Sequence, residues 1–237
     1  SNEIIRSASA WKSGYDGQGV KVAVIDSGID QNHPFLKDSS LPMPSGFPKV
    51  ADMDSLQYIS KKVIVAKVFS SNPSATPQAL GSHGTHVAGT IAGRAGYRDP
   101  MKRSVGPLSG VAPKAYLGNY NVFPCEEDTP CQADSIHIAA AVEAAVNDGM
   151  DVANLSLGSR ADAGFDMLVE VLNAANRAGM ATVISAGNSG PGPMTIGSPG
   201  IAEEAITVAA VHNSHFFGHY ASVKAEDKER KISIGSS

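Results

Sequence analysis

The sequence lacks the features that would mark a membrane protein or a nucleic-acid-binding protein. No run of about 18 apolar residues occurs, so we expect no transmembrane segment. Its 19 basic and 23 acidic residues give a formal net charge of −4, whereas a surface that binds phosphates is basic. With 42% hydrophobic and 18% charged residues over 237 positions, the composition instead predicts a globular domain with a sizeable core.

Cysteine is nearly absent. Cys125 and Cys131 are the only two, and a short acidic segment bounded by prolines lies around and between them. This pattern favours a local disulfide in an oxidising compartment, although two free thiols in a surface loop would give the same pattern. Two cysteines are too few ligands for a metal site, and no others cluster beside them. No signal peptide is present, and Ser1 need not be the natural start.

Short β-branched runs alternate with helical patterns along most of the chain. The expected strands are 20–25, 63–69, part of 110–123, 151–158, 181–186 and 205–211. Helices are expected after His83, from Asp134 or Ser135 to Gly149, and on an apolar stripe made of Phe165, Leu168, Val169, Leu172 and Ala175. Residues 31–60 and 94–109 look irregular. The alternation predicts a three-layer α/β/α fold with a mostly parallel sheet.

Polar residues follow several of these strands. Asp26 follows the first, Ser156 lies near the end of the fourth and Asn188 follows the fifth. Because the carboxyl ends of parallel strands share one edge of a sheet, these side chains can converge there with His83, which opens a helix. An acid that orients a histidine, which then takes a proton from a hydroxyl, is two thirds of a nucleophilic triad. The alternative is that Asp26 merely caps a turn.

Four motifs resemble those of one family and make this interpretation specific. Segments 24–29 (VIDSGI), 82–90 (SHGTHVAGT), 154–158 (NLSLG) and 185–190 (SAGNSG) stand in this order. They resemble the aspartate, histidine, substrate-backbone and oxyanion motifs of the subtilisin-like serine proteases, the subtilase family or peptidase family S8. The resemblance extends over about residues 20–211. It implies a subtilisin-like fold and a serine endopeptidase that works through an acyl-enzyme.

The resemblance also implies a role for each matched residue. Asp26 would orient His83 and stabilise its protonated ring, while His83 would be general base and then general acid. The side-chain amide of Asn188 would stabilise the tetrahedral oxyanion. The residues that would line the substrate groove and its main pocket are Ser156, Leu157, Gly158, Ala186 and Gly187. Because these residues are small, the pocket would admit large apolar side chains without requiring them.

The resemblance implies that no cofactor is required, although structural calcium remains an open expectation. His86 occupies the position of the family's second histidine, which is normally structural. His83 and His86 would be alternative metal ligands, but the glutamate of a His-Glu-x-x-His metalloprotease motif is absent. Calcium commonly supports the fold of this family, and its ligands are not assigned here. Oxygen-rich candidates, which are equally explained as solvated acidic loops, are Asp52, Asp54, Glu126, Glu127 and Asp128.

The family's serine motif, Gly-Thr-Ser-Met-Ala-x-Pro, is missing. Only 49 residues follow Asn188 (237 − 188), and none of their serines stands in that context. We therefore expect this chain alone not to hydrolyse peptides. Two explanations compete: the serine lies in the remainder of the catalytic domain, beyond residue 237, or the protein is a catalytically inert subtilase-like domain that binds extended peptides.

Under the first explanation, residues 1–220 are the N-terminal part of a catalytic domain that is incomplete at its C-terminal end. Residues 221–237 are then a linker or the start of an inserted protease-associated domain. The resemblance implies a secreted or cell-surface enzyme whose partners are polypeptide substrates and a propeptide. Without the helix that the serine opens, apolar sheet surface is expected to be uncovered near Val24, Val183 and Val208.

Overall fold

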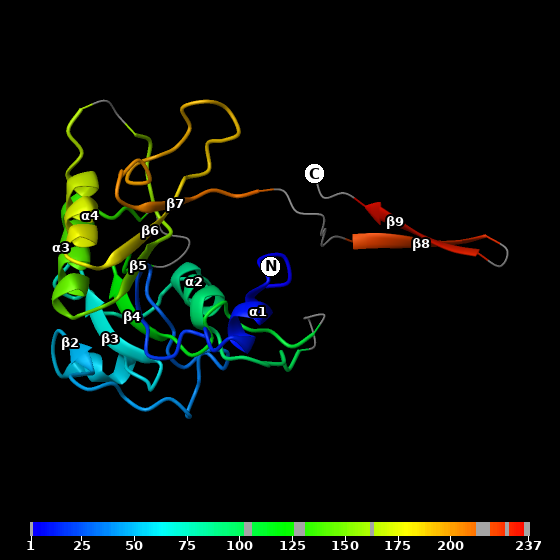
Figure 1. The fold of residues 1–237 in the computed structure, drawn as a ribbon, viewed down its shortest axis with the longest axis horizontal. Helices are drawn as coiled ribbons and strands as arrows, with labels where there is room; N and C mark the ends of the chain where they lie inside the picture. Colours follow the sequence, from blue (N-terminus) through cyan, green and yellow to red (C-terminus); the bar gives the residue numbers. More distant parts are fainter. Residues whose placement is uncertain are drawn as a thin grey trace.

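Figure 1 shows a computed structural model of the chain, which describes residues 2–101, 106–125, 131–161, 164–211, 219–225 and 228–234. Its body is a seven-stranded sheet with the order β2-β3-β4-β1-β5-β6-β7. The strands are β1 (Lys21–Asp26), β2 (Lys49–Val50), β3 (Val63–Val68), β4 (Tyr116–Asn121), β5 (Val152–Leu155), β6 (Ala181–Ser185) and β7 (Ile206–Val208). All neighbouring strands in this sheet run parallel, which confirms the predicted α/β fold class.

Helices cover both faces of the sheet and make three layers (Figure 1). On one face, α2 (His83–Ala92) packs against β1 and β4. On the other, α3 (Ser135–Asn147) packs against the same two strands and pairs with α4 (Met167–Arg177), which contacts β6. A short helix, α1 (Ser7–Lys12), precedes the sheet.

The alternation of side chains along a strand decides which layer each residue meets. In β1, Ala23 and Ile25 belong to the core under α3 and α4. Val22 and Val24 belong to the other core, together with Ala88 of α2. The next residue in this second series is Asp26, so its carboxylate lies on the face that α2 covers, at the carboxyl end of the strand.

Two segments differ from the sequence prediction. Residues 31–60 are not wholly irregular, because they contain β2 and a 3₁₀ helix, η1 (Asp54–Tyr58). Phe165 was expected on the buried stripe of a helix, but it is 85% exposed. The reason is that α4 begins only after Asp166, whose carboxylate accepts hydrogen bonds from the backbone N–H groups of Leu168 and Val169 and so caps the helix.

Exposed apolar sheet surface was expected near Val24, Val183 and Val208, and the structure shows it only at the β7 edge of the sheet. Val24 is buried beneath α2 with 1% exposure, so the prediction of uncovered surface there is wrong. In β7, the strand at the edge of the sheet, Ile206 is 58% and Val208 52% exposed. The register places Ile206 beside Val183, which is half-buried, and these three side chains share the face on which α2 lies.

An antiparallel hairpin follows, made of β8 (His219–Ala225) and β9 (Lys228–Ile234). It projects away from the seven-stranded sheet (Figure 1). The expected division after residue 220 falls inside β8, one residue after the strand begins, and it stays a prediction. Among the described residues, no helix is long and apolar enough to cross a lipid bilayer.

Candidate active site

The carboxylate of Asp26 is held at the end of β1 in a buried position. Its side chain is only 2% exposed. One oxygen, Oδ1, accepts a hydrogen bond of 2.7 Å from the backbone N–H of Ser27. The other, Oδ2, is buried and has no hydrogen-bond partner within the described residues. A buried carboxylate with one unpaired oxygen is costly, which indicates that it has a purpose other than stability.

His83 is the first residue of α2, so the helix start fixes where its ring lies. The backbone N–H of Gly84 donates to the Ser27 hydroxyl at 3.1 Å, which ties the first turn of α2 to the loop after β1. Gly84 also has no room for a side chain, because a Cβ there would collide with the carbonyl oxygen of Gly28. The histidine helix and the aspartate loop are therefore in direct backbone contact.

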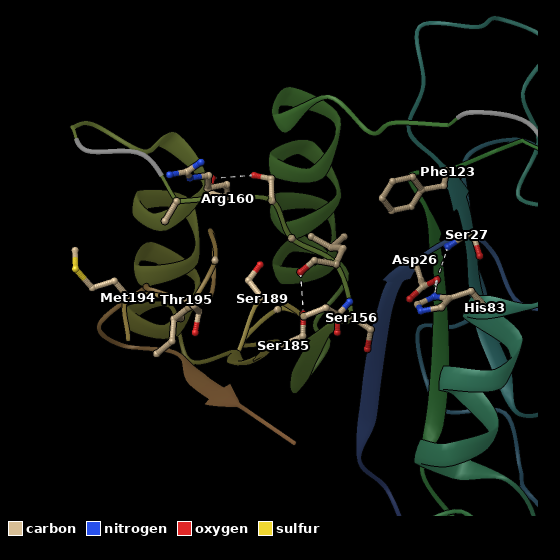
Figure 2. A pocket seen from close by; sticks show the side chains of 18 residues that line it. Asp26, Ser27, His83, Phe123, Ser156, Arg160, Ser185, Ser189, Met194 and Thr195 are labelled. Carbon is tan, nitrogen blue, oxygen red and sulfur yellow. Dashed lines mark hydrogen bonds and ion pairs between the residues drawn. The ribbon is translucent and has the colours of Figure 1, made fainter. Parts of the chain in front are cut away.

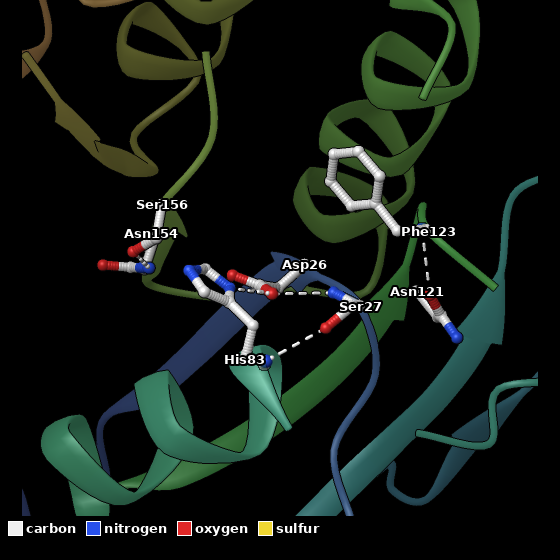
Figure 3. A network of polar contacts seen from close by, with 8 residues as sticks. Asp26, Ser27, His83, Asn121, Phe123, Asn154 and Ser156 are labelled. Carbon is white, nitrogen blue, oxygen red and sulfur yellow. Dashed lines mark hydrogen bonds and ion pairs between the residues drawn. The ribbon is translucent and has the colours of Figure 1, made fainter. Parts of the chain in front are cut away.

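These constraints bring His83 and Asp26 together. The ring Nδ1 lies 2.7 Å from Asp26 Oδ1, although the two residues are 57 positions apart in sequence (Figure 3). An ionised carboxylate can only accept, so Nδ1 carries the hydrogen and Nε2 has a free lone pair. The His83 side chain is 60% exposed, and no described residue is hydrogen-bonded to Nε2. The pair is arranged to take a proton from a group that enters from outside.

An elongated cavity of about 1060 Å³ extends from this pair across the carboxyl ends of the neighbouring strands. Figure 2 shows Asp26 and His83 at one end, and Arg160, Met194 and Thr195 at the other. Of the residues expected to contact substrate, those that line the cavity are Ser156, Leu157, Gly158, Gly187 and Asn188. Ala186 does not line it. It is 8% exposed and its backbone N–H donates to the carbonyl of Val208, so it supports the wall from behind.

The far wall of the cavity is closed by close backbone contacts. Ser159 and Ser198 form an antiparallel bridge with two backbone hydrogen bonds of 2.8 and 3.0 Å. A Cβ at Gly158 would lie 2.9 Å from the carbonyl oxygen of Ser198. The Ser198 hydroxyl donates to Asp166, the residue that caps α4. This end of the cavity therefore depends on Gly158, which has no room for a side chain, and on Asp166. The Asp166 carboxylate caps α4 and also accepts the hydrogen bond from Ser198.

Several lining residues were not expected from the sequence. Phe123 follows β4, and Met194, Thr195 and Ile196 belong to a loop that the Ser159–Ser198 bridge brings over the cavity. No motif marks them, because their position depends on pairing between two loops. Arg160 also lines the cavity, and the expected groove motif ends two residues before it. The sequence marks only lining residues that lie close to a strand end or at the start of a helix, such as Asp26 and His83.

The remaining candidates lie apart from this cavity. His86 is exposed and lines a different cavity, of about 930 Å³. Cys125 and Cys131 are joined as a disulfide. Among the described residues, no group of three or more His, Cys, Asp and Glu side chains could hold a metal ion. Asp52 instead accepts a hydrogen bond from the backbone N–H of Ser55 at the start of η1.

Of the calcium candidates, Asp52 and Asp54 belong to no such group of three side chains within the described part of the chain. Glu126, Glu127 and Asp128 lie outside the described residues. Calcium binding therefore stays a prediction.

Comparisons with known proteins agree with this geometry. A family model described as the subtilase family matches residues 17–237. The minor extracellular protease Vpr of Bacillus subtilis (strain 168) is 38% identical over 222 residues, which are 91% of this chain and 24% of Vpr. Subtilisin E of the same organism is 33% identical over 226 residues, 94% of this chain and 49% of that protein. The PIII-type proteinase of Lactococcus lactis subsp. cremoris (strain SK11) is 34% identical over 242 residues, 90% of this chain and 12% of its own length.

A solved structure, that of the prenylagaramide maturation protease PagA, shares the fold with a TM-score of 0.56. It is 21% identical and the match covers 85% of this chain and 57% of that one. This chain spans half or less of the length of the three sequence relatives. The family model nevertheless covers all but the first 16 residues. This protein therefore belongs to the subtilase family.

Proposed function

We propose that this chain supplies the acid, the base and the oxyanion amide of a serine endopeptidase that is secreted or held at the cell surface. The observation that supports this best is the 2.7 Å contact between Asp26 Oδ1 and His83 Nδ1, with the ring open to the cavity. The relatives support the location, because Vpr is named as an extracellular protease. The nucleophilic serine is supplied from beyond residue 237.

In the proposed reaction, His83 Nε2 removes the proton of the serine hydroxyl as its oxygen attacks the scissile carbonyl carbon. The imidazolium that forms is stabilised by Asp26, which stays ionised. Asn188 donates its side-chain N–H groups to the oxygen of the tetrahedral intermediate, where negative charge develops. His83 then passes the proton to the leaving amine, which yields an acyl-enzyme. Water, activated by the same nitrogen, releases the acid product and restores the serine.

The proposed substrate is an extended polypeptide that lies along the cavity. Ser156, Leu157 and Gly158 leave the sheet at the end of β5, and their backbone N–H and C=O groups would pair with the peptide as an added strand. The side chain before the scissile bond would enter between this segment and Gly187. At this position the wall residues Ser156, Gly158 and Gly187 are small, which supports binding of large apolar side chains. No cofactor takes part, and structural calcium remains a proposal without assigned ligands.

The division of the chain is part of the same proposal. Residues 1–220 would be the N-terminal part of the catalytic domain, and 221–237 would be a linker or the beginning of an inserted protease-associated domain. The partners would be polypeptide substrates, a propeptide and the remainder of the catalytic domain that carries the serine.

The decisive experiment is labelling of the full-length protein with a fluorophosphonate probe, followed by mapping of the labelled peptide by mass spectrometry. The proposal predicts a label on a serine downstream of Ser237 that disappears in His83→Ala. If a folded full-length protein takes no label, it is instead an inert domain, and the cavity is then tested for binding of extended peptides. A label within residues 1–237 would overturn the location of the nucleophile. The isolated chain is expected not to cleave peptides, and Asp26-dependent cleavage by it would contradict this.

A further inference from the structure

The segment that leads from β3 to His83 has a hydrogen-bonding problem that its own backbone does not solve. After Phe69, whose N–H donates to the carbonyl of Asn121 at 2.8 Å, the chain leaves the sheet and forms no helix or strand before α2. Residues 76–78 lie beside the C-terminal half of β4 (Tyr116–Asn121) and belong to no strand. Pro77 is buried, whereas Thr76 and Gln78 are exposed, so the Pro77 carbonyl in particular needs a donor from within the protein.

Two asparagines of β4 provide the donors. The Nδ2 of Asn119 donates to the carbonyl of Pro77 at 2.8 Å, and that of Asn121 donates to the carbonyl of Gln78 at 3.1 Å. Both asparagines are fully buried. They stand two positions apart, so alternation places both on the face of β4 that also carries Leu117, in the same core as Ala88 of α2.

Asn121 also contacts segments on either side of the catalytic pair and the cavity wall. Its Oδ1 accepts from the backbone N–H of Phe123 at 3.0 Å, and Phe123 lines the cavity (Figure 3). Its Nδ2 lies against Gly28, where an added Cβ would come within 3.1 Å of it and within 2.9 Å of Ala79 Cα. One amide therefore touches the loop after Asp26, the segment before His83 and the wall of the substrate cavity.

The side-chain amide of Asn119 makes fewer hydrogen bonds than that of Asn121. Its Oδ1 is buried and has no partner among the described residues. A buried amide that makes one hydrogen bond and leaves its oxygen unpaired is a poor choice for stability alone. Its one described side-chain hydrogen bond goes to Pro77, in the segment before the histidine.

We propose that Asn119 and Asn121 are positioning residues that hold segment 76–78 and thereby fix where α2 begins and how His83 meets Asp26. They touch neither substrate nor the reacting atoms, and they act through the backbone before His83. The part of this proposal that concerns catalytic turnover rests on the proposed function. The effect of the two asparagines on the tautomer of the His83 ring does not, because it can be measured in this chain alone.

The test uses the chain with ¹⁵N-labelled histidine and reads the His83 tautomer by long-range ¹H–¹⁵N NMR at neutral pH. Asn121→Asp keeps the oxygen that accepts from Phe123 but replaces the donor to Gln78 by an acceptor. Asn119→Ala removes one hydrogen bond together with the unpaired oxygen, so it is the variant less at risk of not folding. In both we expect the Nδ1–H tautomer of His83, dominant in the unchanged chain, to give way to a mixture.

The matched control is Asn176→Ala in α4. Asn176 also donates its Nδ2 to a backbone carbonyl, that of Leu172 at 2.9 Å, but on the opposite side of the sheet. The Asn176→Ala variant should lower the midpoint of thermal unfolding without changing the His83 tautomer. If the two β4 variants behave like this control, with lowered stability and an unchanged tautomer, the asparagines are only structural and the proposal is overturned.

Kinetics of the full-length protein provide the second readout. We expect kcat to fall about 10- to 100-fold with KM changed less than about 2-fold, because a small displacement of a catalytic group affects the transition state more than binding. If the unsubstituted full-length protein is inactive, the proposed function is refuted. The tautomer measurement still tests the positioning role of Asn119 and Asn121 in that case. Normal kcat in both variants with an altered tautomer would refute the link to catalysis.

Discussion

Gly84 and Gly28 are in backbone contact across the candidate active site: a Cβ on Gly84 would overlap the carbonyl oxygen of Gly28 and approach Asp26 Oδ1 to 3.1 Å. Gly28 itself has a φ of +93°, a conformation that side chains rarely adopt. The first turn of α2 and the loop after β1 thus approach as closely as two backbones can. This contact is what allows His83 to reach a carboxylate buried at the end of a strand.

Substitution of Gly84 by alanine should therefore separate His83 from Asp26. In the full-length protein we expect kcat to fall by about 100-fold, because a shift of about 1 Å in a catalytic group has effects of this size. Gly106→Ala is the control, since a Cβ there meets nothing within 4 Å. Steady-state kinetics on both variants would check this, and equal activities would show that the loop can move aside without consequence.

Asp26→Asn should leave the fold intact but reduce kcat by about 10⁴-fold, because an amide no longer fixes the histidine tautomer. Asn is nearly isosteric with Asp, so the hydrogen bond from Ser27 can persist. Circular dichroism and thermal unfolding must accompany the kinetics. A loss of activity that follows entirely from unfolding would contradict the orienting role of the carboxylate.

Asn188→Ala should lower kcat by about 100- to 1,000-fold with little change in KM, because in the proposed mechanism the amide contacts the developing oxyanion rather than the bound peptide. This range is the one measured for loss of the corresponding donor in subtilisin, a member of the same family. Ser189→Ala, at the next position along the same wall, is the matched control. An unchanged kcat in Asn188→Ala would remove the oxyanion role.

Lys62 should make stability depend on alkaline pH. It is fully buried, and its ammonium donates to the carbonyls of Ala92, Pro113 and Ala115. Burial lowers its pKa from 10.5 to about 8, an effect that the charge of Asp38 partly opposes. Between pH 8 and 10.5 the unfolded chain holds the proton that the folded chain has lost. Stability therefore rises with pH in this window, by about 3 kcal/mol in total.

Urea unfolding of the chain and of Lys62→Met between pH 7.5 and 10.5 would measure this dependence. The difference between the two unfolding free energies isolates Lys62 from other groups that titrate in the same range. We expect that difference to change steadily across the window in favour of the unchanged chain. Parallel curves would mean that the ammonium loses its proton at the same pH in both states.

The exposed face of β7 should bind hydrophobic dyes. Ile206 and Val208 are more than half exposed on the same strand, beside the half-buried Val183. We expect the chain to enhance the fluorescence of anilinonaphthalene sulfonate, and the Ile206→Thr/Val208→Thr variant to do so less, since threonine retains the preference for strands. Phe165→Ser removes an isolated exposed side chain and serves as the control. Equal fluorescence from all three would place dye binding elsewhere.

Local sequence patterns determined much of this protein. The β-branched runs and amphipathic stripes predicted the strands and helices of the α/β body, because burial on both faces of a parallel sheet needs continuous apolar strands. The aspartate, histidine and asparagine motifs were visible because each lies directly after a strand or at the start of a helix, where backbone conformation restricts the residue type. The short distance between Asp26 and His83 was anticipated from the rule that parallel strands end at one edge.

Only the tertiary structure decided the rest, because it depends on contacts between segments far apart in sequence. Asn119 and Asn121 read as unremarkable polar positions in a strand until the fold places residues 76–78 across them. Phe165 fell outside its helix because Asp166 was available to cap it, and Val24 was buried because α2 lies over β1. The far end of the cavity is set by a bridge between Ser159 and Ser198. Pairings of this kind produce no periodic pattern in the sequence, because each segment's composition reflects only its own local structure.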